Sequence, residues 1–586
     1  MEKIKILVEG EENVGVSIAK FLSSTKNSNP IANISKLNIG VNGNKTVGFL
    51  RNKDYSDNNI NDMILNDTTM GTFSFGDNAE NSTLIRSDKY GITIAKNITV
   101  DKGKEGNSFA QALGEGKITN NAKLESKGRI KFTGLIAKGK IVNKGITNYS
   151  TITNTGTIEI TGNGSGNVGM AALGDGNLVN SGTVTVTGNG DKKVGIYNIG
   201  NKAEIKDGSQ INVSGNSTTG IFNKTIMNID GKVTINAKDG STGIYSSGGT
   251  ITSTSGNNLK ITVTGSSKKG LGVYVENTNA DLTGADINVV KGEAGVAAYG
   301  SGTQLNLTGA TLKYDGDGYA VYSDGNGKIN LTNSKIELRG KSALMEIDLS
   351  LPVSSRPITT TNTDVKVFSN DVVAINATNL GTKNLSTLSA LKSQLGVNIT
   401  AGTEGGKTFN YKELAIENGE INFDVTSDKA AADTTAGGFF FKKVLGQRLR
   451  LNINENLTAK LSSAIATEFY NGQVVGVEAN SSKQATNNTE TQVNIAAGKV
   501  VDVARTDGTD KGGVGVFVNY GLVNNKGTIS IEKDTVANSG AVGVYAVNGS
   551  EVTNEGTVDV SGKESIGLLG LAYRTVEEED KDKDGK

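Results

Sequence analysis

Residues 180–198 read NSGTVTVTGNGDKKVGIYN, and this stretch contains both elements of a repeat that runs along most of the chain. In its first half, valines alternate strictly with threonines after an Asn-Ser-Gly turn, which is the pattern of a half-buried β-strand. In its second half, a glycine lies between two β-branched residues and is followed by a tyrosine. The stretch therefore predicts at least two short strands joined by turns, without a helix.

The glycine motif of this stretch recurs at intervals of about 25 residues, a period typical of solenoids. Its copies, with Gly or Ala at the centre, lie at Gly169, Gly195, Gly220, Gly243, Gly272, Gly295, Ala320, Ala343, Gly476, Gly515, Gly543 and Gly567. The period is too short for a propeller blade, and the regular leucines of a leucine-rich repeat are absent. We therefore predict an all-β chain folded as a right-handed parallel β-helix (a β-solenoid), with stacked inward aliphatic side chains and asparagine ladders at the turns.

Breaks in this repeat divide the chain. We expect irregular β coils in residues 1–100, β-helix repeats in 101–345, an irregular insertion or distorted coils in 346–470, β-helix repeats in 471–572 and a charged linker or tail in 573–586. In the irregular region, leucines at helical spacing between Leu385 and Leu395 predict a short helix. The same region contains GGFFFKKVLGQRLRLNINENL (437–457), the densest aromatic and basic patch of the chain.

Composition excludes several kinds of chemistry. The 586 residues include 60 basic and 60 acidic side chains, so the balanced charge gives no reason to expect nucleic acid as a partner. Because there is no Cys and no His, disulfides, zinc–thiolate sites and Ser-His-Asp triads are ruled out. A long β-rich chain without Cys suits export. The apolar run Ile6–Val8 is too short for a signal peptide, so we expect an exported protein to be represented here by a fragment.

Four local motifs have the appearance of ligand sites. Gly164–Gly169 matches GxGxxG, but a strand pattern follows where a dinucleotide site needs a helix. Ala401–Thr408 resembles a phosphate-binding loop without the surrounding βα pattern, and Asp580–Gly585 begins like a calcium loop without its distal Glu. Asp315–Gly318 is isolated, whereas calcium-binding β-roll repeats occur in tandem. We interpret them as turns or solvated charges and expect no catalytic, cofactor-binding or metal-binding residue.

An aromatic row is the candidate partner-binding site. Strand alternation places Val194 and Ile196 on the core face, and Gly195 and Tyr197 on the outer face. Stacked coils should then align an outer ladder, interrupted at Ala297, that consists of Tyr197, Phe222, Tyr245, Tyr274 and Tyr322. Either each ring covers a neighbouring glycine and holds the register of the sheet, or the rings form a stacking platform for a sugar or a protein partner.

The coils NTGTIEITGNGSGNVGM (154–170), NSGTVTVTGNGDKKVGIYN (180–198) and NEGTVDVSGKESIGLLG (554–570) resemble the passenger regions of type V autotransporters. They are most similar to the very large adhesins of fusobacteria and their relatives, as are NSTLIRSDKYGITI (81–94) and FYNGQVVGVEANSS (469–482). The resemblance implies a surface-displayed β-helical passenger, here a fragment without the signal peptide and C-terminal β-barrel of such proteins. It carries no shared catalytic residues.

The resemblance implies adhesion to host or bacterial cells. We expect a non-enzymatic, monomeric rod at the cell surface that binds a surface protein or glycan, joined to the outer membrane only through the absent barrel. Residues 346–470 are the region expected to give partner specificity, because loops project where a solenoid is interrupted. Two alternatives remain: a polysaccharide-degrading enzyme, which requires acidic and basic groups in one groove, and a passive stalk for an absent tip domain.

Overall fold

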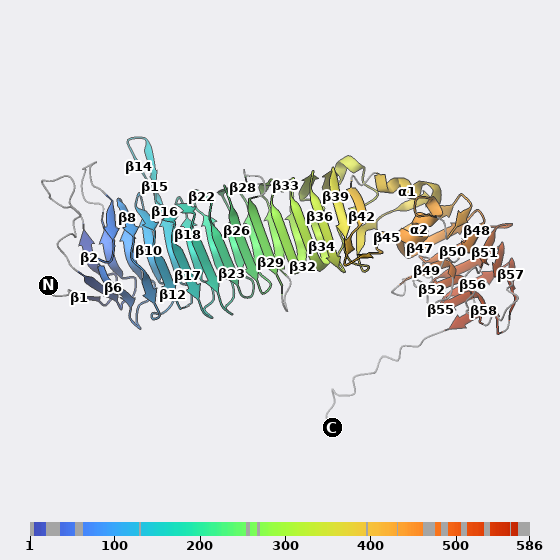
Figure 1. The fold of residues 1–586 in the computed structure, drawn as a ribbon, viewed down its shortest axis with the longest axis horizontal. Coiled ribbons are helices and arrows are strands. Elements are labelled where there is room, and N and C mark those ends of the chain that lie inside the picture. Colours follow the sequence, from blue (N-terminus) through green and yellow to red (C-terminus); the bar gives the residue numbers. More distant parts are fainter. Residues whose placement is uncertain are drawn as a thin grey trace, which may run out of the picture. The chain divides into compact units, whose positions relative to one another are not determined.

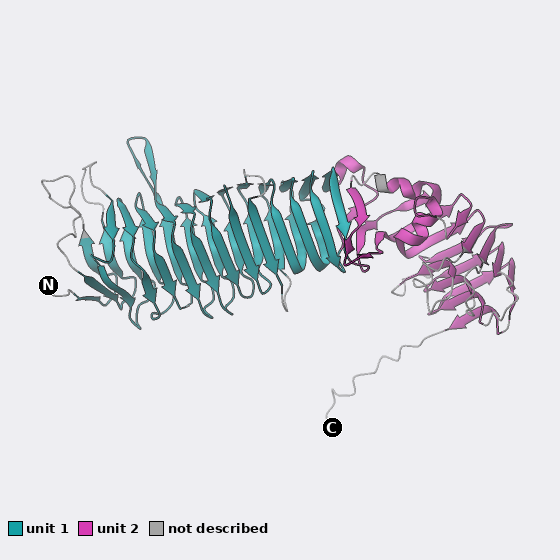
Figure 2. Ribbon diagram, viewed as in Figure 1, with its two compact units in different colours: residues 1–342, 357–368 teal, residues 343–356, 369–586 magenta. Residues whose placement is uncertain are grey.

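The computed structural model describes residues 5–18, 36–52, 62–68, 70–127, 130–253, 258–265, 270–393, 397–429, 432–460, 475–481, 490–504, 513–531, 540–562 and 564–571. The chain forms two compact units (Figure 2). Unit 1 comprises Met1–Ser342 and Pro357–Phe368, and unit 2 comprises Ala343–Arg356 and Ser369–Lys586. The expected tail 573–586, with its calcium-like motif, lies outside the described residues. Residues 461–474 also lie outside them.

Each regular coil of unit 1 contributes three short strands. In the coil that begins within residues 180–198 these are β20 (Thr183–Thr187), β21 (Val194–Ile199) and β22 (Lys202–Ile205). They pair in parallel, and in register, with the three strands of the next coil, β23 (Gln210–Ser214), β24 (Thr219–Asn223) and β25 (Ile226–Ile229). The strands of successive coils lie side by side along unit 1 (Figure 1). The predicted all-β parallel β-helix is therefore confirmed, and with β22 each regular coil has three strands, where the pattern predicts at least two.

Three long parallel strand series form the walls of unit 1. The first, named the aromatic sheet, contains β2 (Val14–Ile18), β4 (Val47–Arg51), β7 (Thr83–Ser87), β10 (Ser108–Leu113), β13 (Thr133–Lys138), β18 (Val168–Leu173), β21, β24, β27 (Thr242–Ser247), β30 (Gly270–Glu276) and the second halves of β32 (Asp286–Tyr299) and β34 (Thr311–Ser323). The second contains β9 (Ile98–Val100), β12 (Lys123–Ser126), β17 (Thr157–Thr161), β20, β23, β26 (Val233–Lys238), β29 (Leu259–Thr264), the first halves of β32 and β34, β36 (Lys335–Gly340) and β39 (Thr363–Val367).

The third wall is a 12-stranded sheet. Its strands are β5 (Met63–Leu65), β8 (Gly91–Ile94), β11 (Lys117–Asn120), β16 (Thr151–Asn154), β19 (Asn177–Asn180), β22, β25, β28 (Thr250–Ser253), β31 (Asn279–Leu282), β33 (Gln304–Thr308), β35 (Lys328–Thr332) and β38 (Ile358–Thr361). A separate 3-stranded sheet near the N-terminus consists of β1 (Lys5–Val8), β3 (Leu37–Val41) and β6 (Met70–Phe75). Inward aliphatic residues from the walls stack in register, as Val184, Ile211, Ile235 and Ile261 do, and each is 0 % exposed.

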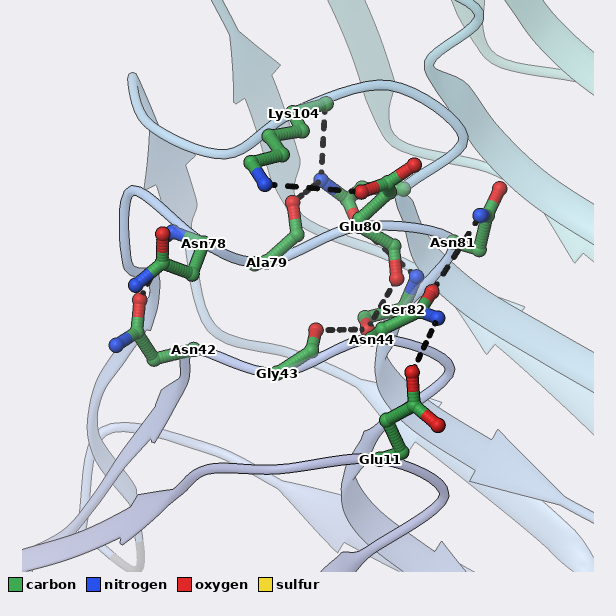
Figure 3. Close-up of polar contacts among 11 residues, drawn as sticks. Glu11, Asn42, Gly43, Asn44, Asn78, Ala79, Glu80, Asn81, Ser82 and Lys104 are labelled. Carbon is green, nitrogen blue, oxygen red and sulfur yellow. Dashed lines mark hydrogen bonds and ion pairs between the residues drawn. The ribbon is translucent and has the colours of Figure 1, made fainter.

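Ladders of polar side chains provide hydrogen-bond partners at the turns between coils. The sequence predicts such ladders for asparagine. The buried side-chain amides of Asn120, Asn154 and Asn180 form a chain of two 2.8 Å hydrogen bonds. Near the N-terminus, the Ser82 hydroxyl donates to the carbonyl oxygens of Gly43 and Glu80, both at 2.8 Å (Figure 3). Because buried polar groups are costly when unpaired, these ladders fix the stacking of turns that contribute little apolar surface.

One hairpin departs from the parallel pattern of unit 1. Strands β14 (Lys140–Asn143) and β15 (Ile146–Tyr149) pair antiparallel and protrude from the solenoid (Figure 1). Their two connecting residues, Lys144 and Gly145, have φ values of 48° and 79°, as a type I′ turn requires. The repeat pattern did not predict this hairpin.

Unit 2 contains three further parallel sheets. One consists of β37 (Met345–Asp348), β40 (Val373–Thr378), β45 (Lys412–Phe423), β47 (Val444–Ile453), β50 (Gln492–Ile495), β53 (Leu522–Asn525) and β56 (Glu551–Asn554), with β41 (Gly381–Asn384) also paired to β45. The others consist of β46 (Ser427–Asp428), β48 (Leu457–Lys460), β51 (Val500–Ala504), β54 (Thr528–Ile531) and β57 (Thr557–Val560), and of β49 (Val475–Asn480), β52 (Val514–Asn519), β55 (Val542–Val547) and β58 (Ile566–Leu571).

Helices interrupt the coils of unit 2. Helix α1 (Leu385–Ser393) confirms the helix predicted from the leucine spacing, although Leu395 lies outside the described residues. Helix α2 (Ala436–Lys443) was not predicted, and begins where the Thr435 side chain accepts a hydrogen bond from the Gly438 amide. A 3₁₀ turn (Val353–Ser355), β42 (Val397–Ala401) and the small antiparallel pair β43 (Thr403–Glu404) and β44 (Lys407–Thr408) complete the unit.

Candidate functional site

The aromatic row predicted from the repeat forms a ladder of stacked rings on the aromatic sheet. The register pairs Tyr197 with Phe222, Phe222 with Tyr245, and Tyr245 with Tyr274. The ring centroids of these pairs are 5.0, 5.3 and 4.9 Å apart, with the first pair nearly parallel and the other two edge-to-face. Such separations lie within the range of favourable aromatic contacts. The five predicted residues are thus brought into one row, and the row includes a further ring.

Tyr299 fills the expected gap in the ladder. The backbone register pairs Tyr274 with Ala297 and Ala297 with Tyr322, so this coil has an alanine where the neighbouring coils have a ring. The Tyr299 ring lies 5.0 Å from the Tyr274 ring and 5.5 Å from the Tyr322 ring. Ala297 is only 2 % exposed. The rings therefore form a continuous series, which we name the aromatic ladder: Tyr197, Phe222, Tyr245, Tyr274, Tyr299 and Tyr322.

The glycines two residues before Tyr197, Phe222, Tyr245 and Tyr274 face the core, so the expectation that Gly195 shares the outer face with Tyr197 is wrong. A Cβ atom at Gly195 would lie 2.6 Å from both the Ile211 Cγ2 atom and the Gly220 carbonyl oxygen. Ile196 is also buried, at 0 % exposure, whereas Val194 is only partly buried and is not the core residue expected. Two consecutive inward residues mean that the strand bends at the glycine and breaks the alternation. The space that a side chain at Gly195 would need is therefore filled by core atoms and not by a ring.

The rings of the ladder are partly buried rather than free in solvent. Burial raises the pKa of the Tyr245 and Tyr274 hydroxyls, and the nearby Glu276 carboxylate acts in the same direction. The Tyr245 hydroxyl also donates a 3.3 Å hydrogen bond to Glu276. Burial, followed by the neighbouring Tyr322, raises the pKa of Tyr299 to about 12. These three hydroxyls thus stay protonated to a higher pH than the hydroxyl of an exposed tyrosine.

The stacking decides which parts of the ladder a partner can reach. Where two rings stack nearly parallel, as Tyr197 and Phe222 do at 13°, each occupies one face of the other. What the ladder offers to a partner is therefore mainly ring edges and hydroxyl groups, with Glu276 beside them. Ring edges and hydroxyls suit a protein or glycan surface with hydrogen-bonding groups. Both interpretations of the row, register and recognition, are compatible with this geometry.

Unit 2 contains a polar groove that the repeat pattern did not predict. It encloses about 390 Å³ at the bends of three successive strands, β41, β45 and β47. Its charged and polar lining residues are Thr382, Asn418, Glu420, Arg448, Arg450 and Glu490. The dense basic patch at 437–457, which contains both arginines, was the signal available in the sequence. The carboxylates come from other coils, and only the coil register brings them beside the arginines.

A second cavity of unit 2, of about 300 Å³, lies among α2, β45, β47 and β49. Its lining includes Phe440, Phe441, Lys412 and Lys429. The Lys429 ammonium donates to the Val475 carbonyl and lies 5.3 Å from the Phe441 ring centroid. The Lys412 ammonium donates to the Lys442 carbonyl at 2.9 Å. Both cations therefore already connect α2 and the neighbouring strands, which is a structural role.

Gly164–Gly169 and Ala401–Thr408 contain the predicted turns, but the prediction of a turn is wrong for Asp315–Gly318, which lies within strand β34. Gly164–Gly169 leads from β17 into β18, a strand and not a helix. Ala401–Thr408 contains β43 and β44, joined through Gly405 and Gly406 with positive φ. At Asp315–Gly318, both glycines leave room for the buried Tyr314 hydroxyl, whose oxygen would lie 2.6 Å from a Cβ at Gly316. Among the described residues, no group of His, Cys, Asp or Glu side chains is arranged to hold a metal ion.

No family model matches the chain, and no curated protein matches it. Within the part of the chain that the structure describes, no helix combines the length and apolar character needed to cross a membrane. The class that fold and site define is a parallel β-solenoid with an outer aromatic ladder in unit 1 and a charged groove in unit 2.

Proposed function

We propose that this chain is the surface-displayed passenger of an autotransporter and that it acts in adhesion to host or bacterial cells through the aromatic ladder. The observation that carries the proposal is the unbroken series of partly exposed rings from Tyr197 to Tyr322 on the aromatic sheet. Aromatic residues are enriched among the residues that contribute most to binding at protein interfaces. The resemblance of the coils to autotransporter adhesins supports the same function.

Repetition of the coil supplies the mechanism. Successive coils are about 4.8 Å apart, so ring edges recur at about that spacing along the ladder, and every ring except that of Phe222 adds a hydroxyl. Each contact contributes little, but several made together by one rigid surface raise the overall affinity. A partner with repeated hydrogen-bonding groups, such as a surface glycan or an extended protein segment, fits this arrangement.

The test is adhesion of beads coated with the full chain to a panel of bacterial and epithelial cells. The double variant Tyr245→Leu/Tyr274→Leu removes two central rings but keeps apolar side chains, and is expected to lower the number of bound beads about tenfold. A matched control, Phe517→Leu/Tyr545→Leu, removes a pair of rings 5.5 Å apart in unit 2 and should bind like the wild type. Equal adhesion of both variants and the wild type would contradict a role for the ladder.

The polar groove favours a second candidate, a polysaccharide-degrading enzyme on the same fold. Glu420 and Glu490 lie there with Arg448 and Arg450, which is the combination of acidic and basic groups that such an enzyme requires. Release of reducing ends or unsaturated sugars from a polysaccharide panel would support this candidate, and intact polysaccharides would contradict it. Beads that bind no cell would instead favour the passive stalk.

A further inference from the structure

We propose that the groove of unit 2 binds a neutral oligosaccharide. This site is separate from the aromatic ladder, and the proposal does not depend on adhesion through the rings. The shape of the groove, the balance of its charges and the spacing of its hydrogen-bonding groups support it.

The groove follows a line of bends in the parallel strands. Gly381, Asn418 and Arg448 have φ values of 64°, 60° and 49°, and Asn418 and Arg448 occupy equivalent positions of β45 and β47. Left-handed residues inside a strand bend it, so stacked bends produce a continuous concavity. Asn and Gly adopt this conformation readily, whereas an arginine does so at a cost. Arg448 bears this cost, and its side chain lines the groove.

The charges of the groove compensate each other. Two carboxylates, of Glu420 and Glu490, line it together with two guanidinium groups, of Arg448 and Arg450. Arg448 Nη1 lies 4.0 Å from Glu490 Oε2, and its Nη2 atom also contacts the carboxylate of Glu417, which is not a lining residue. The groove therefore has no excess of positive charge to attract an anion. The carboxylates would repel an anionic ligand such as a phosphate or a uronate. The guanidinium groups would repel a cationic ligand. An uncharged ligand avoids both repulsions.

The hydrogen-bonding groups are oriented and repeat from coil to coil. The register places Thr382, Glu420 and Arg450 in one column across three strands. The Glu420 carboxylate is fixed by hydrogen bonds from the Asn452 amide at 2.6 Å and the Thr382 hydroxyl at 3.4 Å. Beside the lining, two residues further along β45 and β47, Asn422 and Asn452 form an amide ladder with Asn494 of β50 through two 2.7 Å hydrogen bonds. Within the groove, the hydroxyl, carboxylate and guanidinium groups of Thr382, Glu420 and Arg450 thus come from strands about 4.8 Å apart.

A chain of hydroxyl-bearing sugar rings matches this array. Hydroxyl groups both donate and accept, so they can bond to carboxylate, guanidinium and amide groups in turn. Hydrogen bonds to charged groups are stronger than those between neutral groups, which lets an open groove hold an uncharged ligand. The groove is open, so we expect weak binding by each sugar and tighter binding as the number of sugars rises.

Isothermal titration calorimetry of the full chain tests the proposal with four probes: cellohexaose, maltohexaose, hexa-N-acetylchitohexaose and hexagalacturonate. At least one neutral probe is expected to bind more tightly than hexagalacturonate. Arg448→Asn removes the guanidinium and supplies the residue found at the equivalent bend, Asn418, so it should keep the fold and weaken binding of that probe about tenfold. Glu420→Gln can keep the Asn452 hydrogen bond and should also weaken binding.

Glu204→Gln is the matched control, because Glu204 is a partly exposed glutamate of unit 1 that pairs with Lys202 and Lys206. It should bind like the wild type. Tighter binding of hexagalacturonate, no binding of any neutral probe, or normal binding by both groove variants would overturn the proposal. Loss of oligosaccharide binding with unchanged cell adhesion would assign the two functions to separate sites.

Discussion

The ring of Tyr299 lies 5.0 Å from that of Tyr274, although the sheet register pairs Tyr274 with Ala297. Tyr299 is two residues beyond Ala297 in β32, and its ring contacts the rings of Tyr274 and Tyr322, so it continues the aromatic ladder. The ladder is thus maintained by side-chain packing where the repeat itself is interrupted. This relationship makes Tyr299 the residue at which ladder continuity can be tested.

Replacing Tyr299 by alanine should destabilise unit 1 by about 1–3 kcal/mol, because it removes two aromatic pairs worth about 0.5–1.5 kcal/mol each. Urea unfolding followed by far-ultraviolet circular dichroism measures the change. Tyr299→Phe keeps both ring contacts and should stay within about 0.5 kcal/mol of the wild type. Equal stability of the alanine variant and the wild type would show that the Tyr299 ring does not support the fold.

The same tyrosine should make stability depend on pH at the alkaline end. The pKa of Tyr299 is raised from 10.0 to about 12, so the folded state retains a proton that the unfolded state releases. The contribution of the protonated Tyr299 hydroxyl to the free energy of unfolding is complete below pH 10.0 and is lost as the pH rises through about 12. Phenolate absorbance in a spectrophotometric titration checks the pKa. Tyr299→Phe should remove one late-titrating group, and an unchanged titration curve would contradict the assignment.

Gly195→Ala should destabilise the solenoid by about 1–3 kcal/mol, because overpacking forces the backbone or the neighbouring side chains to move. The added Cβ would lie 2.6 Å from atoms of Ile211 and Gly220. Gly567 occupies the same place in the last described motif, but a Cβ there has no atom within 4 Å. Gly567→Ala should therefore be tolerated in thermal unfolding. A tolerated Gly195→Ala would mean that the glycine does not face the core.

Asn180→Ala should lower the free energy of unfolding by about 1–3 kcal/mol, because it removes the side-chain acceptor of a buried amide. The Asn154 Nδ2 atom donates to Asn180 Oδ1 at 2.8 Å, and both residues are 0 % exposed. Asn258→Ala, at an exposed asparagine, is the control and should change the free energy of unfolding by less than about 0.5 kcal/mol. Chemical unfolding of the two variants compares them directly, and similar losses would argue against a structural ladder.

The periodicity of the sequence was sufficient to predict the architecture of stacked coils. A motif that returns about every 25 residues with alternating aliphatic positions permits few folds other than stacked coils. Its regular spacing also predicts the alignment of Tyr197, Phe222, Tyr245 and Tyr274, which the sheet register confirms. The same reasoning assigned the wrong face to Gly195, because alternation assumes a straight strand and this strand bends at the glycine.

The sequence by itself therefore determined the parallel β-helix, the asparagine ladders and the aromatic row, because each depends on a short local pattern repeated at a constant interval. Only the tertiary structure decided the bridging position of Tyr299 and the groove around Glu420 and Arg448. Thr382 and Glu420 are 38 residues apart in the chain, whereas coils of unit 1 bring together residues about 25 apart. Where the interval changes, neighbours across coils are set by the backbone register and by the bends of the strands, and these form only when the coils pack.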